Sequence, residues 1–599
     1  MKLNKFLLSA IAAASLTACS DSPEIVDNNK GQWNADGTGY VSLSIKMPDN
    51  VASKGGRANT NINGSHNDQF DDGDLNEYAV YNAMLVIFTG SNSDAEGAYK
   101  LTAAYNLPLT FNGKDPIDDQ ISSISTATTK IDAINATNAK ALVILNKPSS
   151  ITLDEDNHMI SLNTTSLKDK TFAEFQKLTS EVVTELNGTT GFTMTNAPLT
   201  TSQSSTSAPS AGTTTTLADI KIGNVKRTAE EAKAAPAADV YVERSVAKVT
   251  IKGAGVARQL TGATDVHYQV EEFALDNTNS TSYIVRNADK TNADSDPWYT
   301  LKSQSSSVTG ADQYRFIGNV AVKDGYYRTY WAEDPNYNVQ YDATHTEVPQ
   351  LQTSNNPSFV ATDNALYCME NTFNVENQKA EYTTRALLKV CFWKGSQDTK
   401  PSTLETLYMY NNDVNTLNNE ANFKAAAVNE VNKIPAVKAY KGGVASIELT
   451  TTNGYAEVTG VTFVTGTTTE TSGEVFNIVK GHLGKISVYE NGYAYYPVLI
   501  KHFGDQLTPW NTNEYGSTAP AVGGIDQIYP VDNRDANYLG RYGVVRNNWY
   551  ELNINSVKRP GKPGIDTPSD TPDDELDSYI SVSINILSWA KRSQDVDLQ

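Results

Sequence analysis

The segment from Ser578 to Trp589 constrains the fold most, because apolar and small polar residues alternate along it. It reads SYISVSINILSW, and the apolar residues of one face are Ile580, Val582, Ile584 and Ile586. This period of two predicts a β-strand. Residues 558–577 before it are rich in Pro, Gly, Asp, Ser and Thr, which predicts a flexible linker that cannot pack. Because an isolated strand leaves its backbone groups unpaired, this strand must join a sheet elsewhere.

A second segment near the other end of the chain carries the same pattern. Residues 40–47 read YVSLSIKM, with Val41, Leu43, Ile45 and Met47 on one face. We interpret the two strands as alternative occupants of one groove. In this hypothesis a protease cuts at Arg57 and removes the first strand. The C-terminal strand of another copy then adds to the vacated sheet.

The first nineteen residues predict export and lipidation. Lys2 and Lys5 precede an apolar run from Phe6 to Leu16, and the run ends in Leu-Thr-Ala-Cys19. This is the pattern of a bacterial lipoprotein signal peptide over residues 1–18, and the alternative is an ordinary secretory signal with an unrelated cysteine. The run is too short to span a bilayer as a mature helix, and no other segment approaches that length.

Length and composition predict a mainly β protein of several domains. The chain has 599 residues, 39% of them hydrophobic, and a formal charge of −21, which argues against binding nucleic-acid phosphates. We expect a propeptide with the removable strand (19–57), an N-terminal β domain (58–254), a C-terminal β domain (255–558), a linker (559–577) and a donor-strand tail (578–599). Short helices are expected at 126–139, 171–186 and 417–432.

Motifs for enzymatic chemistry are absent from the sequence. The six histidines are scattered, and there is no HExxH, P-loop, Cys-x-x-Cys or GxSxG pattern. We therefore expect no catalytic residue, no metal site and no cofactor. Cys368 and Cys391 remain after the signal region, and they are compatible with a disulfide or with two buried thiols.

Three further stretches carry a resemblance to a known family. They are VERSVAKV at 242–249, YCMENT at 367–372 and VVRNNWY at 544–550, the last followed by the linker and the terminal strand. With the lipoprotein signal, this arrangement resembles the fimbrillins of Bacteroidales, the type V pilins. Within that family it is most similar to the major shaft subunits of the short fimbriae of Porphyromonas.

The resemblance implies a domain architecture and a sequence of processing and assembly steps. It implies two β-sandwich-like (transthyretin-like) domains, made as an outer-membrane lipoprotein precursor with its lipid on Cys19. An Arg-specific surface protease would cleave after Arg57 and leave Ala58 as the first residue. The partners implied are other copies of the chain in a homopolymer, accessory anchor and tip subunits, and host or bacterial surface receptors. The resulting fimbria would mediate adhesion and biofilm formation.

Two alternatives stay open at this point. The chain is compatible with an accessory tip or anchor subunit, which need not donate a strand or need not lose its lipidated one. It is also compatible with a monomeric glycan-binding surface lipoprotein, which would need no loop cleavage.

Overall fold

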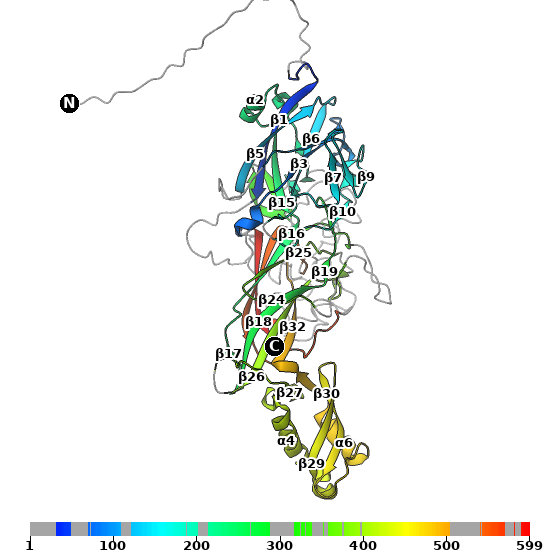
Figure 1. Cartoon of the computed structure of the whole chain (residues 1–599), viewed down its shortest axis with the longest axis vertical. Coiled ribbons are helices and arrows are strands. Elements are labelled where there is room, and N and C mark those ends of the chain that lie inside the picture. Colours follow the sequence, from blue (N-terminus) through cyan, green and yellow to red (C-terminus); the bar gives the residue numbers. More distant parts are fainter. Residues whose placement is uncertain are drawn as a thin grey trace, which may run out of the picture.

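The computed structural model arranges the chain as three units along one long axis (Figure 1). The residues that it describes are 32–48, 70–71, 74–109, 121–186, 189–201, 214–263, 265–287, 317–323, 325–329, 331–337, 351–352, 357–373, 377–395, 398–502, 540, 542–568, 580–581 and 589–598. The fold is mainly β with a few short helices, as the sequence predicts.

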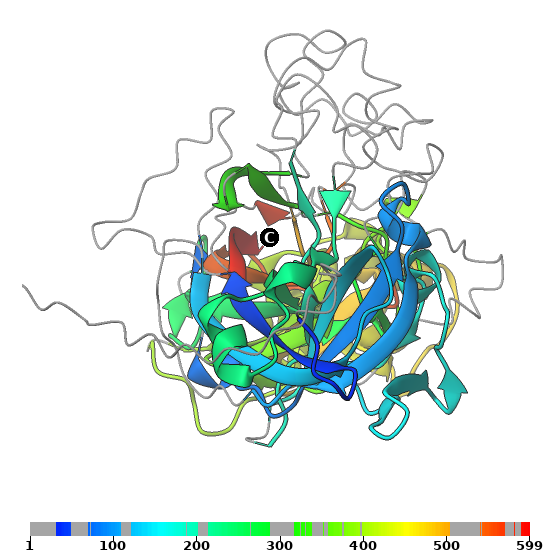
Figure 2. The same cartoon turned by 90° about the horizontal axis from the view of Figure 1, so that it is seen from above.

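The N-terminal unit is one curled sheet with strand order β4-β3-β6-β11-β15-β1-β5, and β14 pairs with β6. Its strands are β1 (Thr38–Pro48), β3 (Ala83–Gly90), β4 (Lys100–Asn106), β5 (Ile121–Asp132), β6 (Asn138–Leu145), β11 (Met194–Asn196), β14 (Ala218–Asp219) and β15 (Ala238–Arg244). The sheet curls until its two edges meet, and Asp132 N donates to Tyr105 Oη at 3.1 Å between β5 and β4. Figure 2 shows this curl from above.

Both faces of this sheet are covered. Alternate side chains of β3, such as Leu85 and Val86, belong to two different apolar cores. We call the core that contains Leu85 the inner core and the core that contains Val86 the outer core. A small sheet and a helix cover the outer core: β7 (Ile151–Asp154), β8 (Met159–Leu162), β9 (Thr165–Ser166) and α1 (Phe172–Phe175). Helix α2 (Ala229–Ala234) contacts β1 and β5. The unit is therefore a layered domain with its sheet in the middle.

The second unit is a β-sandwich. One sheet has the order β2-β35-β33-β16-β25 with β34 paired to β35, and the other has β17-β18-β26-β32 with β24 paired to β18. The first sheet comprises β2 (Phe70–Asp71), β16 (Val246–Lys252), β25 (Ala365–Met369), β33 (Asn548–Val557), β34 (Ile580–Ser581) and β35 (Trp589–Leu598). The second comprises β17 (Arg258–Gln259), β18 (Val266–Asp276), β24 (Val360–Ala361), β26 (Arg385–Lys394) and β32 (Tyr493–Leu499). Val249, Leu388 and Leu552 are examples of the alternating residues that fill the core between the sheets.

Short strands bridge these two units. Strand β10 (Thr179–Ser180) pairs with β20 (Ser282–Tyr283), and β12 (Leu199–Thr200) pairs with β22 (Tyr326–Thr329). The second pairing belongs to a sheet with the order β13-β12-β22-β21, which also holds β13 (Thr214–Thr215) and β21 (Ile317–Lys323). Strands β19 (Thr278–Asn279) and β23 (Leu351–Gln352) pair beside the sandwich. The stronger connection is β15–β16, in which Ser245 alone separates a strand of the first sheet from a strand of the second.

The third unit is inserted between β26 and β32. Because these two strands pair antiparallel, the chain leaves and re-enters the sandwich at neighbouring positions. The insert has the sheet order β28-β27-β31-β30-β29, covered by three helices over its own core. Its elements are β27 (Leu407–Tyr410), β28 (Asn418–Asn419), α4 (Glu420–Val431), α5 (Pro435–Ala439), β29 (Val444–Thr452), β30 (Tyr455–Phe463), α6 (Glu474–Leu483) and β31 (Ile486–Tyr489). The sequence predicts helix α4 but not a separate unit.

Two expected helices are wrong. Residues 126–132 belong to β5 and residues 138–139 begin β6, with a short connection between them. The β-branched residues Thr126, Thr128, Thr129 and Ile131 favour a strand, and β1 offers a complete partner for it. In the range 171–186 only Phe172–Phe175 is helical. Thr171 and Glu174 form a capping box that starts this helix, but Thr179 and Ser180 then pair with β20.

The expectation that the linker cannot pack is wrong for its first part. Tyr496 Oη donates to Arg559 O at 2.6 Å, and Tyr489 Oη donates to Gly561 O at 3.1 Å. Lys562 and Tyr495 exchange two backbone hydrogen bonds. The segment thus docks through its carbonyl and amide groups, which a reading based on apolar side chains does not detect.

The junction between the first two units holds a buried ionic network. Arg546 Nε lies 3.0 Å from Glu370 Oε2, and Arg286 Nε lies 2.9 Å from Glu243 Oε1. Arg286 also donates to the backbone oxygen of Arg546 at 3.1 Å. Burial raises the pKa of Glu243 to about 7, although Arg286 and Arg546 oppose that rise. Charges this deeply buried are tolerated because each faces an opposite charge.

A second cluster continues the network. Lys248 Nζ lies 2.6 Å from Glu77 Oε1, which also accepts from Tyr367 Oη at 2.5 Å. Arg244 donates to Glu77 O at 3.1 Å and to Asn547 Oδ1 at 3.2 Å. The three stretches that carry the family resemblance, at 242–249, 367–372 and 544–550, therefore meet at one place in the fold.

We expect Glu370→Gln to lower the free energy of unfolding by about 3–5 kcal/mol, because it leaves the Arg546 guanidinium buried without its charge partner. Urea denaturation measures the loss. Glu420→Gln is the matched control, because Glu420 pairs with Lys424 on an exposed helix face and such pairs contribute less than about 1 kcal/mol. Equal effects of the two substitutions would contradict the assignment.

Candidate strand-exchange groove

Strand β1, which the sequence predicts to be removable, is an interior strand of the N-terminal sheet. It pairs antiparallel with β5 along its whole length, from Thr38 opposite Asp132 to Pro48 opposite Ile121. On its other side it pairs in parallel with β15, where Leu43 lies opposite Ala238. Removal of β1 would expose the backbone groups of both neighbours, so the structure defines a groove with two walls.

The predicted apolar face of β1 points into the core. Val41, Leu43 and Ile45 are at most 1% exposed and belong to the inner core of the curled sheet. Met47 lies in β1, but the structure describes only its backbone. Burial of three such side chains contributes roughly 5–9 kcal/mol in gross terms.

The opposite face of β1 is also buried, which the sequence reasoning missed. Ser42 is fully buried and Ser44 is 8% exposed. Thr128 Oγ1 of β5 donates to Ser42 Oγ at 3.1 Å. Helix α2 contacts β1 and β5 and is itself packed through the fully buried Ala232, which belongs to neither apolar core of the sheet. We infer that α2 covers the serine face, where small side chains let the helix approach.

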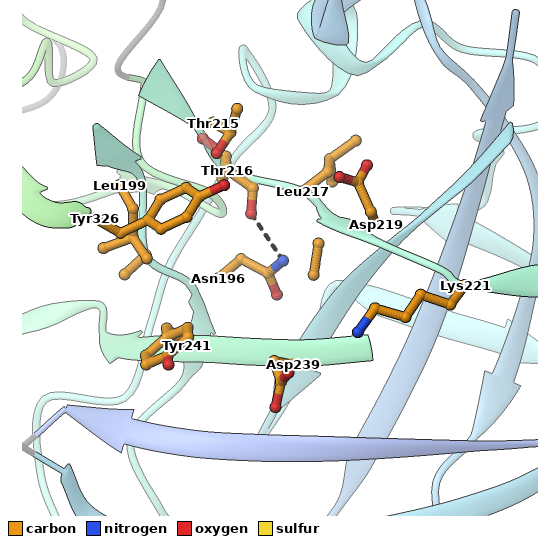
Figure 3. A pocket seen from close by; sticks show the side chains of 12 residues that line it. Asn196, Leu199, Thr215, Thr216, Leu217, Asp219, Lys221, Asp239, Tyr241 and Tyr326 are labelled. Atoms are coloured by element: carbon orange, nitrogen blue, oxygen red, sulfur yellow. Dashed lines mark hydrogen bonds between the residues drawn. The ribbon is translucent and has the colours of Figure 1, made fainter. Parts of the chain in front are cut away.

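A charged contact marks the end of the groove nearest the sandwich. Lys46 Nζ of β1 lies 2.8 Å from Asp239 Oδ1 of β15, and its ammonium also contacts the ring of Tyr241. The pKa of Lys46 is raised, because partial burial, which lowers it, is outweighed by Asp239 and Tyr241. Figure 3 shows Asp239 and Tyr241 at the rim of a polar pocket of about 170 Å³ beside this wall. Loss of β1 would leave Asp239 without this cation.

The start of β1 is anchored by close backbone contacts. Tyr40 and Lys226 exchange two backbone hydrogen bonds of 2.7 and 2.9 Å. A Cβ on Gly39 would lie 2.8 Å from the Trp33 ring, so glycine is needed where that indole crosses the strand. The strand is held along its backbone as well as by its side chains.

The groove continues into the sandwich, because β1 and β33 lie on the same side of β15–β16. Successive residues of a strand direct their backbone groups to opposite sides. Tyr241 O and Ser245 N bond to residues beside β11, on the side away from β1. Arg244 N and Val246 O therefore face the β1 side, and both bond to Asn547 just before β33. Strands β1 and β33, each parallel to this long strand, thus follow one another along it.

The C-terminal tail occupies a different position in this chain. Strand β35 (Trp589–Leu598) runs parallel to β33, and β2 and β34 pair with it. Ile580 lies in β34, whereas Val582, Ile584 and Ile586 lie outside the described residues. Within one chain, β1 therefore fills its groove while the tail joins the sandwich.

The remaining predicted site residues fall into two groups. Cys19, Arg57 and Ala58 lie outside the described residues. Cys368 of β25 and Cys391 of β26 are free thiols on different sheets, so the disulfide alternative is wrong. Burial raises the pKa of each thiol to about 12, which keeps it protonated and unreactive.

Two further features of the described residues bear on the sequence expectations. None of their helices has the length and apolar character needed to cross a lipid bilayer. Nor do these residues place three or more His, Cys, Asp or Glu side chains together as ligands for a metal ion.

Comparison with protein-family models finds one match. Residues 528–595 match the family described as major fimbrial subunit protein type IV, fimbrillin, C-terminal. The match includes β33, β34 and most of β35. No curated protein matches the chain.

Solved structures give distant likenesses. A putative cell adhesion protein from Parabacteroides distasonis is 10% identical, with 94% of this chain and 99% of that chain covered and a TM-score of 0.31. The tip fimbrial protein Mfa3 from Porphyromonas gingivalis, with a C-terminal truncation, is 11% identical, with 58% and 77% covered and a TM-score of 0.22. A fimbrial assembly protein from Parabacteroides distasonis is 11% identical, with 59% and 95% covered and a TM-score of 0.23. TM-scores this low carry no argument about the present chain.

We expect Leu43→Ala to destabilise the uncleaved protein by about 2–5 kcal/mol, because it opens a cavity at a fully buried position of β1. Urea denaturation of the unlipidated precursor measures the change. Val256→Ala serves as the control, since Val256 is 62% exposed. A similarly small effect of both substitutions would show that β1 is not firmly packed in the precursor.

Proposed function

We propose that the chain is a structural major subunit of cell-surface fimbriae that polymerises by protease-activated donor-strand exchange. The match of residues 528–595 to the fimbrillin C-terminal family supports a fimbrial role. In this proposal Cys19 carries the lipid of an outer-membrane precursor. The mature partners are other copies of the chain, accessory anchor and tip subunits, and receptors on host or bacterial surfaces.

One observation carries the proposal: the tail repeats the pattern of β1 position by position. Residues 40–47 read YVSLSIKM and residues 579–586 read YISVSINI. In this alignment every core-facing residue of β1 has an aliphatic counterpart. Ser581 and Ser583 match Ser42 and Ser44, whose side chains are buried on the second face of the groove. An apolar face alone is common among strands. A strand with an apolar face and two serines on the opposite face fits this groove, because both faces of β1 are buried there.

Proteolysis acts as the switch in this proposal. While β1 remains attached, its high effective concentration excludes an incoming strand. A cut after Arg57 separates β1 from the rest of the chain and lets it leave with the lipid. Strand β2 (Phe70–Asp71) follows the cut and stays with the subunit. The vacated groove then presents unpaired backbone groups of β5 and β15, and pairing them drives strand addition.

Donation also requires the tail to leave its own sandwich. Residues 589–598 read WAKRSQDVDL, in which polar and charged residues predominate. Strand β35 pairs with β33 over its length, but β2 and β34 contribute two residues each. The tail therefore has less apolar surface to lose on release than β1, and exchange into a two-sided apolar groove is favourable.

We expect Arg57→Ala combined with Lys54→Ala to leave lipidated monomers at the cell surface, because β1 is then never released. Unboiled SDS gels and electron microscopy of cells measure polymer formation. Lys168→Ala, which removes an exposed basic residue elsewhere, should leave fibres intact. Normal fibres from the double variant would refute the switch.

We expect Ser583→Phe to abolish polymerisation, because its aromatic ring would meet the closed face that Ser44 occupies in the precursor. Asn585→Lys is the matched substitution, since it restores a cation at the position of Lys46, opposite Asp239. The lysine variant should polymerise at least as well as the wild type. Polymer yield is measured after protease treatment of purified precursor, and thermal unfolding of the monomers reports on their fold. Wild-type yield from Ser583→Phe would contradict the proposed register.

A further inference from the structure

The linker before the C-terminal tail is held at the end of the sandwich that carries the insert. Arg385 donates to Asp566 O at 2.6 Å, which fixes the linker to β26. A Cβ on Gly454 would lie 3.0 Å from the Pro563 side chain, so the linker also lies against the turn between β29 and β30. The groove of β1 lies in the N-terminal unit, at the other end of the long axis (Figure 1). The tail therefore starts far from the groove of its own chain.

The length of chain between the linker and the donor strand limits where the next subunit can lie. Tyr579, which aligns with Tyr40 of β1, comes thirteen residues after Asp566. A fully extended chain of that length spans at most about 45 Å. In the proposed register the tail enters the groove at the Tyr40 end, which is the end farther from the sandwich, because β1 runs parallel to β15 towards β16. This end of the next subunit must therefore lie within about 45 Å of Asp566 of the donor.

The insert lies in the same space. It extends from the sandwich in the direction away from the N-terminal unit (Figure 1). Strand β29 has nine residues, which make it about 30 Å long. Its last residues lie near the linker, at the Gly454 turn, and its first residues lie at the end farther from the sandwich. An N-terminal unit that comes within reach of the tail therefore meets the insert of the donor.

One face of the β29–β30 hairpin is polar and exposed on the side from which the tail leaves. We call it the threonine face, and it comprises Glu448, Thr450, Glu457 and Thr459, all of them exposed. The two threonine hydroxyls lie 3.1 Å apart across the strands. The apolar core of the insert and helix α4 lie on the opposite face. Tyr455, two residues before Glu457 on the threonine face, lies beside the linker. The tail thus departs over this face.

The surface beside the entrance of the groove carries the opposite charge. Tyr40 exchanges backbone hydrogen bonds with Lys226, so the segment around Lys226 borders the entrance. We call residues 221–233 the basic rim, because they include four basic and two acidic side chains in a chain whose net charge is −21. Its last residue, Lys233 of α2, is exposed. The rim lies after Arg57 in the sequence, so it stays with the processed subunit.

We propose that in the fibre the threonine face of each insert packs against the basic rim of the next subunit. Glu448 and Glu457 supply the negative charge that complements the rim, and the threonine hydroxyls supply hydrogen-bonding groups. The inference rests on the proposed strand exchange, because the tail brings the two copies together. A single connecting chain does not fix the angle between two subunits, whereas this second contact does.

The test cross-links the two surfaces in fibres grown from purified precursor that is produced without residues 1–19 and then cut by the protease. Thr459→Cys and Lys233→Cys are combined in one chain, and the fibres are treated with a short bis-maleimide and boiled in SDS. We expect covalent dimers and larger ladders, with at least ten-fold more cross-linked chain than in uncut precursor at the same concentration. Cys368 and Cys391 do not interfere, because both are buried.

The matched control combines Lys233→Cys with Ala425→Cys, an exposed residue of α4 on the other side of the insert. It should give no more cross-linking than uncut precursor. All three positions are exposed, so both double variants should keep the wild-type thermal unfolding. Fibre formation is scored separately by electron microscopy. Fibres that cross-link no better through Thr459→Cys than through Ala425→Cys would overturn this contact and leave strand exchange standing. Failure to form fibres at all would overturn both.

Discussion

Burial of β1 on both faces and along both backbone edges is the constraint on which the rest of the structure depends. An edge strand can leave a sheet and let water satisfy the exposed groups, but an interior strand cannot. Without β1, the backbone groups of β5 and β15 that line the groove would lose their hydrogen-bond partners. Each such group that stays buried lowers the stability of the fold by about 1–3 kcal/mol. The N-terminal unit is therefore stable when something of the right shape fills this position. The fold therefore requires that a strand fill this position.

The polar junction gives this position a fixed relation to the sandwich. A buried cluster of two arginines and two glutamates adds little net stability, since well-packed apolar residues in the same place often give an equal or higher free energy of unfolding. The contacts within the cluster are specific, however. Arg286 pairs with Glu243 beside the groove and donates a hydrogen bond to the backbone oxygen of Arg546, and Arg546 in turn donates to Glu370 of the sandwich. The ion pair between Lys248 and Glu77 is a second such contact nearby. The network therefore sets the orientation of one unit against the other, which a smooth apolar interface would leave free to slide.

The sequence predicted those features that depend on alternating apolar residues, and missed those that depend on backbone contacts or small polar side chains. Val41, Leu43 and Ile45 identify β1 and its buried face. Ser42 and Ser44 look like solvent-facing residues, because burial of a serine depends on a neighbouring helix that the strand pattern does not reveal. Residues 559–563 look unable to pack because their contacts are made by carbonyl groups. The insert was not recognised as a unit, because residues 395–406 between β26 and β27 resemble an ordinary polar loop and do not mark a domain boundary.

The uninterrupted course of β15 into β16 has a mechanical consequence. A fibre of such subunits on a cell in flowing liquid would be under tension, and the pull would run from the strand in the groove through β15–β16 towards the tail. The hydrogen bonds between β15–β16 and its parallel neighbours β1 and β33 lie across that direction, so they would be strained together in shear and not peeled apart one after another. Rupture would then require many bonds to fail at once. A single strand passing through both domains would let each subunit transmit force without relying on the contact surface between them.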